Sequence, residues 1–154
     1  MYAPVERIGL IEIREGSPED IVALYPAILE LVDAHGIAEY EKRLLNAPKH
    51  LLLVTFDAEK AVGFKAGYER DSDGSFYSWM GGVARTHRRC GIARQLAQRM
   101  EYWAKAQGYT SIRLKTCNSH KLMLVFALNN RFNILGVEPR ETIGEYRITL
   151  EKKL

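Results

Sequence analysis

The chain has 154 residues, of which 47% are hydrophobic and 27% charged, the size and composition of one globular domain with a real core. No apolar run approaches the length of a membrane span, and the N-terminal segment carries charges and too short an apolar run for a signal peptide, so we expect a cytoplasmic protein without a membrane role. A net charge of +3 is too small to indicate nucleic-acid binding by itself, and two cysteines and four scattered histidines predict neither a disulfide framework nor a metal site.

The first part of the chain predicts one strand and two helices. The segment IEIRE (11–15) alternates apolar and charged side chains, as a half-buried strand does. Ser17 is a suitable helix N-cap, because a proline at the first helical position and two acidic residues follow it. Apolar residues continue at helical spacing, so we expect this helix to reach about Val32, before a break at 33–36. A second helix is predicted over 38–46.

Three apolar segments in the middle of the chain predict an antiparallel meander. They are HLLLVTF (50–56), AVGFKAGYE (61–69) and SFYSWMGGV (75–83), and each is rich in β-branched, aromatic or other apolar residues. Short polar turns separate them at 57–60 and 71–74. Such turns between strand-like segments favour antiparallel neighbours.

An amphipathic helix follows the meander. Its apolar stripe consists of Ile92, Leu96, Met100 and Trp103. Polar and charged residues lie opposite this stripe, and Gly108 is placed to end the helix. The next segment, SIRLKTC (111–117), alternates again and is predicted to be a strand.

The last third of the chain predicts a helix and two closing strands. KLMLVFAL (121–128) is apolar enough for a buried strand or a helix; we favour a helix, because several apolar residues can share a face and Asn118 or Ser119 can cap it. The closing strands are expected within GVEPRET (136–142) and EYRITLE (145–151). No repeat or linker divides the sequence, so we expect a single α/β domain over residues 1–154.

The segment HRRCGIA (87–93) joins a predicted strand, ending near Ala84, to the amphipathic helix, beginning near Gly91. The first N–H groups of a helix have no intrahelical acceptor, and with the positive end of the helix dipole they form an anion site. Gly91 lets a ligand approach the backbone, and the arginine side chains can bind phosphate oxygens; these are Arg88, Arg89 and Arg94. The segment therefore predicts a diphosphate site, and the absence of G-x-G-x-x-G and of a P-loop sequence excludes the two common phosphate motifs.

The residues RRCGIA (88–93) fit the [Q/R]-x-x-G-x-[G/A] signature of the GCN5-related N-acetyltransferase (GNAT) superfamily. Val83 lies five residues before Arg88, as in that family, and the following helix and strand come at the family's spacing, with Asn118 at the usual strand end. The chain thus resembles this superfamily over essentially all of its length. The resemblance implies a mixed, mostly antiparallel central sheet flanked by helices.

The resemblance also implies an acetyl-CoA site and a direct acetyl transfer to a primary amine of a small molecule or protein, without a covalent enzyme intermediate. The pantetheine arm would pair with the strand edge around Val83, the amides of residues 89–94 would hold the pyrophosphate, and Asn118 would contact the cofactor. The expected cofactor-binding residues are Val83, Ala84, Arg85, Arg88, Arg89, Cys90, Gly91, Ile92, Ala93, Arg94 and Asn118. The protein would supply proximity, a backbone amide that stabilises the oxyanion and a path for the proton of the amine.

The sequence departs from the family on its last helix. Many members carry a tyrosine there that protonates the leaving thiolate, whereas this chain has Leu124, Val125 and Phe126, so the general acid stays unassigned. The helix usually ends in Gly-Phe, whereas this chain has Arg131 and Phe132, which implies an unusual cap or a changed loop.

The catalytic base differs as well. Some members place a catalytic glutamate six positions before the residue that matches Val83, and Tyr77 occupies that position here. A tyrosine with a pKa near 10 is a poor base at pH 7. A water relayed by Tyr77, or by Glu69 on the neighbouring strand, is therefore the better hypothesis.

The acceptor amine stays open among polyamines, amino acids, aminoglycosides, and protein N-termini or lysines. Two sets of residues could shape its pocket: Tyr68, Tyr77 and Trp79, for which packing is favoured, and Asp33, His35 and Glu39, for which a surface role is favoured. Gly81 and Gly82 mark either a bulge that splays the strand and opens a slot for the cofactor, or a flexible strand end.

Two other functions of the chain remain possible interpretations of the sequence. The leading rival is a non-catalytic acyl-CoA-binding or regulatory module, and a nucleic-acid-binding protein that uses the arginine cluster ranks last. Cys117 is interpreted as a free, inert thiol rather than a nucleophile. A homodimer through the closing strands stays open.

Overall fold

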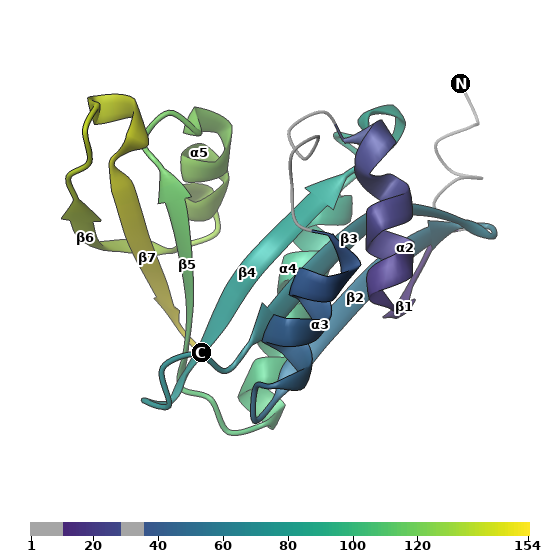
Figure 1. The fold of residues 1–154 in the computed structure, drawn as a ribbon, viewed down its shortest axis with the longest axis horizontal. Helices are drawn as coiled ribbons and strands as arrows, with labels where there is room; N and C mark the ends of the chain where they lie inside the picture. Colours follow the sequence, from purple (N-terminus) through teal and green to yellow (C-terminus); the bar gives the residue numbers. More distant parts are fainter. Residues whose placement is uncertain (1–10, 29–35) are drawn as a thin grey trace.

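The structure is a computed structural model that describes residues 11–28 and 36–154. Its centre is a seven-stranded sheet in the order β1-β2-β3-β4-β5-β7-β6 (Figure 1). The strands are β1 (Ile11–Glu15), β2 (His50–Asp57), β3 (Lys60–Tyr68), β4 (Ser75–Val83), β5 (Ser111–Cys117), β6 (Asn133–Glu138) and β7 (Arg147–Lys153). All neighbouring strands are antiparallel except β4 and β5, which are parallel. The predicted α/β fold with a mostly antiparallel sheet flanked by helices is confirmed.

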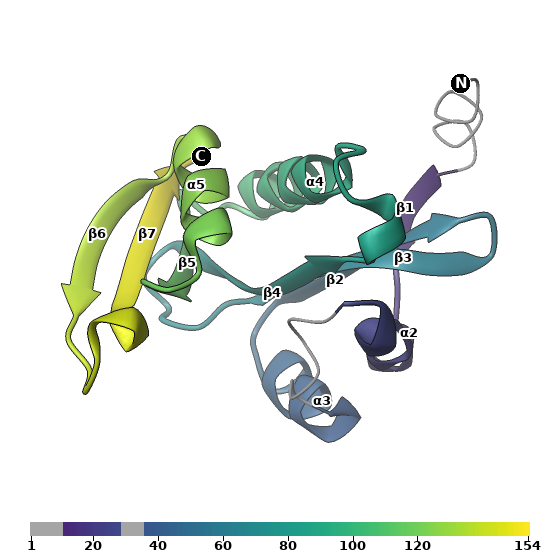
Figure 2. The same ribbon diagram turned by 90° about the horizontal axis from the view of Figure 1, so that it is seen from above.

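The helices cover both faces of the sheet. They are α2 (Pro18–Leu24), α3 (Ile37–Leu45), α4 (Ile92–Ala106) and α5 (Lys121–Asn129), with short 3-10 turns η1 (Tyr25–Ala27), η3 (Arg85–His87) and η4 (Ile143–Glu145). Figure 2 shows α2 and α3 on one face, and α4 and α5 on the other. In the described part of the chain, no helix is both long enough and apolar enough to cross a membrane.

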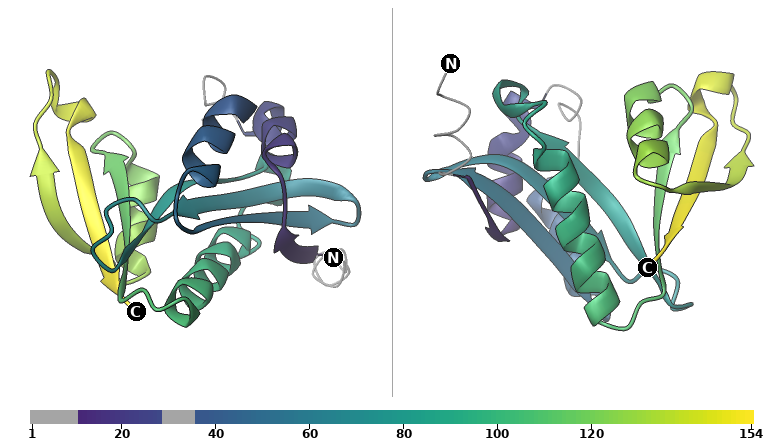
Figure 3. Two further views of the ribbon diagram at one scale, coloured as in Figure 1. Left: turned by 60° about the horizontal axis from the view of Figure 1, so that its bottom comes forward. Right: turned by 180° about the vertical axis from the view of Figure 1, so that it is seen from behind.

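The sheet opens between its two parallel strands. β4 and β5 pair only over residues 75–77 and 111–113, and beyond these residues the strands diverge (Figures 1 and 3). A β-bulge lies close to this point, because Ala66 of β3 pairs with Met80 while Gly67 pairs with Ser78, which leaves Trp79 as the extra residue. A bulge bends and twists its strand. We call residues 78–83 of β4 and 114–117 of β5 the β4–β5 splay.

The sequence placed a bulge or a flexible end at Gly81 and Gly82; the structure corrects this to a bulge at Trp79. The two glycines instead continue the pairing with β3 in regular register, with Gly81 opposite Lys65 and Gly82 opposite Phe64. They leave two successive positions of β4 without side chains.

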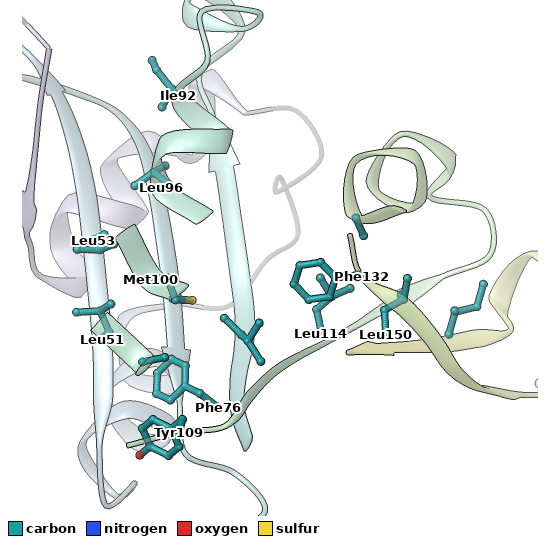
Figure 4. Packing of buried hydrophobic residues seen from close by; sticks show 14 of the residues in the cluster. Leu51, Leu53, Phe76, Ile92, Leu96, Met100, Tyr109, Leu114, Phe132 and Leu150 are labelled. Carbon is teal, nitrogen blue, oxygen red and sulfur yellow. The ribbon is translucent and has the colours of Figure 1, made fainter. Parts of the chain in front are cut away.

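Two apolar cores lie on opposite faces of the sheet. The core on the α4 and α5 side contains residues of β2 and α4, such as Leu51, Leu53 and Met100, and residues under α5, such as Leu114 and Leu150. Figure 4 shows these groups on the two sides of the splay. The second core lies between the sheet and the helices α2 and α3. A single core therefore packs against the strands on both sides of the splay.

The helix that begins at Ser17 is shorter than predicted. Ser17 is its N-cap, as predicted, and forms a capping box with Asp20. The α-helix ends at Leu24, a 3-10 turn follows, and Ile28 is extended. Pro26 explains the early end, since it has no N–H to donate and its ring clashes with the preceding turn. The rest of the predicted helix falls in residues 29–32, outside the described residues.

The later boundaries confirm most of the sequence predictions. The second helix, the three central strands, α4 with its end before Gly108, β5 and the helical assignment of 121–128 all hold. The predicted cap of α5 was wrong: His120 is the N-cap, because the side chain of Asn118 bonds the carbonyl of Ile143 instead. The first closing strand, β6, lies earlier than predicted and ends before Pro139.

Candidate functional site

The start of α4 presents free backbone amides. Its first backbone hydrogen bond runs from the Gln95 amide to the Gly91 carbonyl at 3.0 Å, so the amides of Ile92, Ala93 and Arg94 lie ahead of the first intrahelical bond. Gly91 is left-handed, with φ of 80°, and a Cβ built on it would have no heavy atom within 4 Å. The backbone here is open to a ligand, as the sequence predicts.

Positively charged side chains lie around these amides, in the loop before α4 and in its first turn. Arg88, Arg89 and Arg94 are exposed, and Arg89 is also left-handed, with φ of 59°. Left-handed residues in a loop can turn successive amides to the same side, a backbone geometry that binds anions. Cys90 is an exposed free thiol in the same loop. Together these groups make the N-terminus of α4 a candidate anion site.

Several hydrogen bonds hold the loop against the sheet. The guanidinium of Arg88 donates to the Val83 carbonyl at 3.1 Å, and the amide of Ala84 donates to the Val62 carbonyl at 2.7 Å. Buried His87 lies 2.7 Å from a carboxylate oxygen of Asp57 through Nε2. An ionised carboxylate only accepts, so Nε2 carries the proton and donates to it. The loop is therefore fixed before any ligand arrives.

The sequence did not reveal the pairing of His87 with Asp57. The two residues are 30 positions apart, and Asp57 reads locally as an ordinary turn residue. The hydroxyl of Thr86 lies 2.7 Å from the other ring nitrogen of His87, so the imidazole is held on both sides. No local pattern predicts this hydrogen bond, because it depends on how the end of β2 packs against the loop after β4.

The edge of β4 beside the splay is accessible. Residues 75–78 are buried, whereas Gly81 is exposed and Val83 is half-buried. In the described chain no strand pairs with β4 on this side beyond Tyr77. An unpaired strand edge presents N–H and C=O groups that another extended chain can pair with. The predicted binding residues Val83, Ala84 and Arg85 lie where this edge meets the anion site.

Asn118 lies across the splay, directly after β5. Its side chain donates to the carbonyl of Ile143 at 3.1 Å and accepts from Lys121 at 3.1 Å. Its amide donates to the Tyr146 carbonyl at 2.8 Å. These bonds connect the end of β5 to the turn before β7. Asn118 therefore shapes the far wall of the splay, and its contact with a cofactor stays a prediction.

The structure places the two catalytic candidates on different faces of the sheet. Tyr77 is the last residue of β4 that pairs with β5, and its ring belongs to the core under α2 and α3. Glu69 interacts with Tyr109, which belongs to the core under α4. Burial, with a contribution from the Glu69 carboxylate, raises the pKa of Tyr109 to about 12. The contacts of the two candidates therefore lie in different cores.

Burial also raises the pKa of Tyr77, although the nearby guanidinium of Arg70 opposes the shift. The guanidinium of Arg70 lies 4.8 Å from the centre of the Tyr77 ring. A phenol with a raised pKa keeps its proton at neutral pH. Tyr77 can therefore hold or pass on a proton through a water molecule, and it is not a base by itself.

The aromatic residues predicted to pack do so. Tyr68 meets Tyr77 and Trp79 edge to face at centroid distances of 5.6 and 5.8 Å. Glu39 forms an ion pair with Arg43 at 2.7 Å, and the guanidinium of Arg43 lies 4.7 Å from the centre of the Trp79 ring. The two other candidates for reading the amine, Asp33 and His35, lie outside the described residues.

The model of the Acetyltransferase (GNAT) family matches residues 19–124. Among solved structures, Ard1 from Thermoplasma volcanium is 20% identical, with a TM-score of 0.76, covering 94% of this chain and 98% of that chain. An aminoglycoside 6'-N-acetyltransferase complexed with coenzyme A is 17% identical, with a TM-score of 0.76, covering 92% of this chain and 96% of that chain.

A third solved structure is yncA from Salmonella typhimurium with its cofactor acetyl-CoA, which is 17% identical, with a TM-score of 0.72, covering 94% of each chain. At these identities the solved structures share the fold. No curated protein matches the chain. The family model, however, matches well over half of the chain and includes the whole anion site. The chain belongs to the acetyltransferase (GNAT) family.

Proposed function

We propose that the protein transfers the acetyl group of acetyl-CoA directly to a primary amine of a small molecule or protein at the β4–β5 splay. Its family makes the chain an acyltransferase with acetyl-CoA as co-substrate. One observation carries the proposal: the anion site at the start of α4 adjoins the unpaired edge of β4. A diphosphate carrying an extended amide-containing arm matches that combination.

The residues present suit each part of acetyl-CoA. The amides ahead of the first α4 bond, with the exposed arginines, suit the pyrophosphate. The pantetheine arm contains two amides, so it can pair with the β4 edge as an additional strand would. Arg88 supports this arrangement, because its bond to Val83 holds the loop and the strand edge in one orientation.

In the proposed reaction the neutral amine attacks the thioester carbonyl carbon, and the carbon–sulfur bond then breaks. The protein holds both reactants in one orientation, which replaces a bimolecular encounter. A backbone N–H on the β4 edge would stabilise the oxyanion of the tetrahedral intermediate. Tyr77, at the closed end of the splay, would pass the proton of the amine to water. Glu69 is the alternative relay and lies on the opposite face.

The remaining parts of the function are also proposals. The acceptor is a primary amine whose identity is open, and the protein needs no nucleic acid and no membrane for this reaction. A cytoplasmic location and a homodimer through the closing strands stay predictions from the sequence.

The first experiment is calorimetric titration of acetyl-CoA into the wild-type protein and into Gly91→Glu. The glutamate side chain would fill and repel the pyrophosphate site, so we expect no detectable binding to this variant. Gly108→Glu is the matched control, because Gly108 is also left-handed, with φ of 96°, and also has open space around its Cβ position, but lies at the other end of α4. Both substitutions cost about 1–2 kcal/mol of backbone strain, and circular dichroism checks that both variants fold.

Binding that survives in Gly108→Glu and disappears in Gly91→Glu supports the proposed site. Absence of binding to the wild type overturns the proposal. Thiol release with a panel of amines then separates transfer from binding alone, since a non-catalytic acyl-CoA-binding module would retain cofactor affinity and release no CoA in response to an acceptor.

A further inference from the structure

Lys65 lies over the bare part of β4. It belongs to β3 and pairs in register with Gly81. A Cβ built on Gly81 would lie 3.7 Å from Cγ of Lys65 and 3.8 Å from its Nζ. The side chain therefore runs along Gly81, and its ammonium lies above β4 where Gly81 is exposed and no strand pairs on the other side.

The charge of Lys65 is poorly compensated. In the described part of the chain its Nζ forms neither a hydrogen bond nor an ion pair. The carboxylate of Glu101 on α4 acts on it from a distance and is itself paired with Lys152 of β7 at 2.6 Å. The strand positions opposite Lys65 are occupied by Leu53 and Gly81, which carry no charge. An unpaired, half-buried ammonium is costly in a fold and calls for a reason.

The pKa of Lys65 reflects this environment. Burial lowers it to about 8, and the Glu101 carboxylate opposes the shift. At pH 7 the side chain is therefore still mostly charged, but it gives up its proton far more readily than an ordinary lysine does.

The position of Lys65 corresponds to the reacting end of acetyl-CoA in the proposed complex. The pyrophosphate would lie at the start of α4 and the arm would run along β4 past Val83, so the next positions along the edge are Gly82 and Gly81. Two residues without side chains leave room for a thioester beside the strand. Lys65 is the cation that reaches this point from the neighbouring strand.

The helix α5 on the opposite side of the splay offers no equivalent group. The α5 sequence KLMLVFALN contains no hydroxyl, and its lysine, Lys121, is bonded to Asn118. Resting on the proposed acetyl transfer, we propose that the Lys65 ammonium is the catalytic proton donor to the leaving CoA thiolate.

The step balances in atoms and charge. When the tetrahedral intermediate collapses, the carbon–sulfur bond breaks and its electron pair stays on sulfur. The Lys65 ammonium transfers one proton to that sulfur, which gives CoA thiol and a neutral lysine. The proton lost by the attacking amine passes to solvent, and Lys65 recovers a proton from solvent before the next cycle.

The acidity of Lys65 suits this step. A thiol has a pKa of about 8.5 and an ordinary lysine about 10.4, so transfer from an ordinary lysine to a thiolate is uphill. A lysine with its pKa lowered to about 8 is comparable in acidity to the thiol, so the uphill difference is removed.

The test compares Lys65→Met and Lys65→Arg with the wild type at saturating acetyl-CoA, with the amine of the panel that gives the fastest release of CoA as acceptor. We expect kcat to fall about 100-fold in both variants, because Arg keeps the charge but does not release its proton. The Kd for acetyl-CoA should change little, and Lys60→Met, at the exposed start of β3, should behave as the wild type. Wild-type kcat in Lys65→Arg, or a loss confined to cofactor affinity, overturns the assignment.

The pH profile gives a second readout. The kcat of the wild type should fall as the pH rises above about 8, since Lys65 then loses its proton, and Lys65→Met should lack this falling limb. Glu101→Gln removes the carboxylate that raises the pKa of Lys65, so the limb should move to lower pH. A limb that stays in place in both variants contradicts the proposal.

A third readout needs no acceptor. Acetic anhydride modifies neutral amines, and mass spectrometry of wild-type peptides should show a midpoint near pH 8 for Lys65 and slower labelling of Lys65, but not of Lys60, when CoA is bound. If CoA binds and leaves Lys65 unprotected, Lys65 is not beside the thiol. If acetyl-CoA does not bind to the wild type, the proposed function itself fails, and the two failures are thus distinguished.

Discussion

The two arms of the sheet differ in how completely they are covered. The first arm, β1 to β4, has α4 on one face and α2 and α3 on the other (Figure 2). The second arm, β5 with β7 and β6, carries α5 on one face, and all six residues of β6 are exposed. The exposed large apolar side chains of the second arm are Leu122, Val125, Leu128, Ile134, Leu135, Val137 and Ile143.

Most side chains proposed to act in the reaction lie in the first arm, which helices cover on both faces. Lys65 and Tyr77 belong to the first arm, and the anion site follows directly after it. The second arm contributes a strand edge and Asn118. Reacting groups must be held to within fractions of an ångström, and an arm packed on both faces fixes side chains better than an arm packed on one. The comparison predicts that equivalent changes have larger effects in the first arm.

The largest expected effect is that of a methyl group added inside the first arm. In Gly67→Ala the new Cβ would lie 2.6 Å from a ring carbon of Phe76 and 2.7 Å from the Tyr77 carbonyl, so backbone must move. We expect a loss of about 3 kcal/mol in the free energy of unfolding. Gly136→Ala in β6 is the matched change, because a Cβ there meets nothing within 4 Å, and it should alter stability by less than about 0.5 kcal/mol.

Urea denaturation of the two alanine variants measures the difference. Equal losses would show that the second arm is packed as tightly as the first, and would contradict the expected difference between the arms.

A smaller effect is expected from the pair of His87 and Asp57, which holds the loop before α4. Asp57→Asn replaces the carboxylate that accepts from His87, in a pair whose side chains are 9% and 20% exposed, and should cost about 1.5–3 kcal/mol of stability. It should also weaken acetyl-CoA binding, because the loop that presents the α4 amides loses its tie to the turn between β2 and β3. Thermal denaturation and calorimetry measure the two effects.

The control lies in the second arm. Glu138→Gln breaks an exposed ion pair with Arg140, whose members are 53% and 49% exposed, and should cost at most about 1 kcal/mol. Cofactor affinity should not change in this variant. An Asp57→Asn variant with wild-type cofactor affinity would mean that the loop keeps its conformation without the His87 tie.

The candidate anion site could be proposed from the sequence because its signals are local. A glycine at the start of an amphipathic stripe, with three arginines around it, is visible within ten residues. The end of α2 was missed even though its signal, Pro26, is equally local, because the apolar periodicity beyond it outweighed the proline. Local patterns thus predicted most elements and the open backbone before α4, with errors where two local signals compete.

Lys65 and the Asp57 tie could not be predicted in the same way. Lys65 gains its role from its register with Gly81, 16 positions away, and from the approach of Glu101 on α4. The bulge at Trp79 sets that register, and glycine content alone placed the bulge two residues too late. Such features depend on which residues the sheet brings side by side, and a single sequence does not contain that information in local form.

The smallest effect in this series is expected where the two arms meet. Tyr77 is the last residue of the first arm that is paired with the second, and its raised pKa makes it a proton relay that stays neutral. Tyr77→Phe removes only the hydroxyl and should lower kcat by about tenfold, which corresponds to about 1.4 kcal/mol, without changing the Kd for acetyl-CoA. Steady-state kinetics and calorimetry on the same preparation separate these quantities.

Tyr40→Phe provides the matched loss of a hydroxyl away from the splay. It removes the acceptor of the 2.7 Å bond from the Tyr25 hydroxyl and should lower stability by about 1 kcal/mol while leaving kcat unchanged. If Tyr77→Phe instead loses stability and keeps its kcat, the ring of Tyr77 is part of the core alone. Another group would then have to pass the proton of the amine to water. Glu69→Gln, on the opposite face, becomes the next variant to measure.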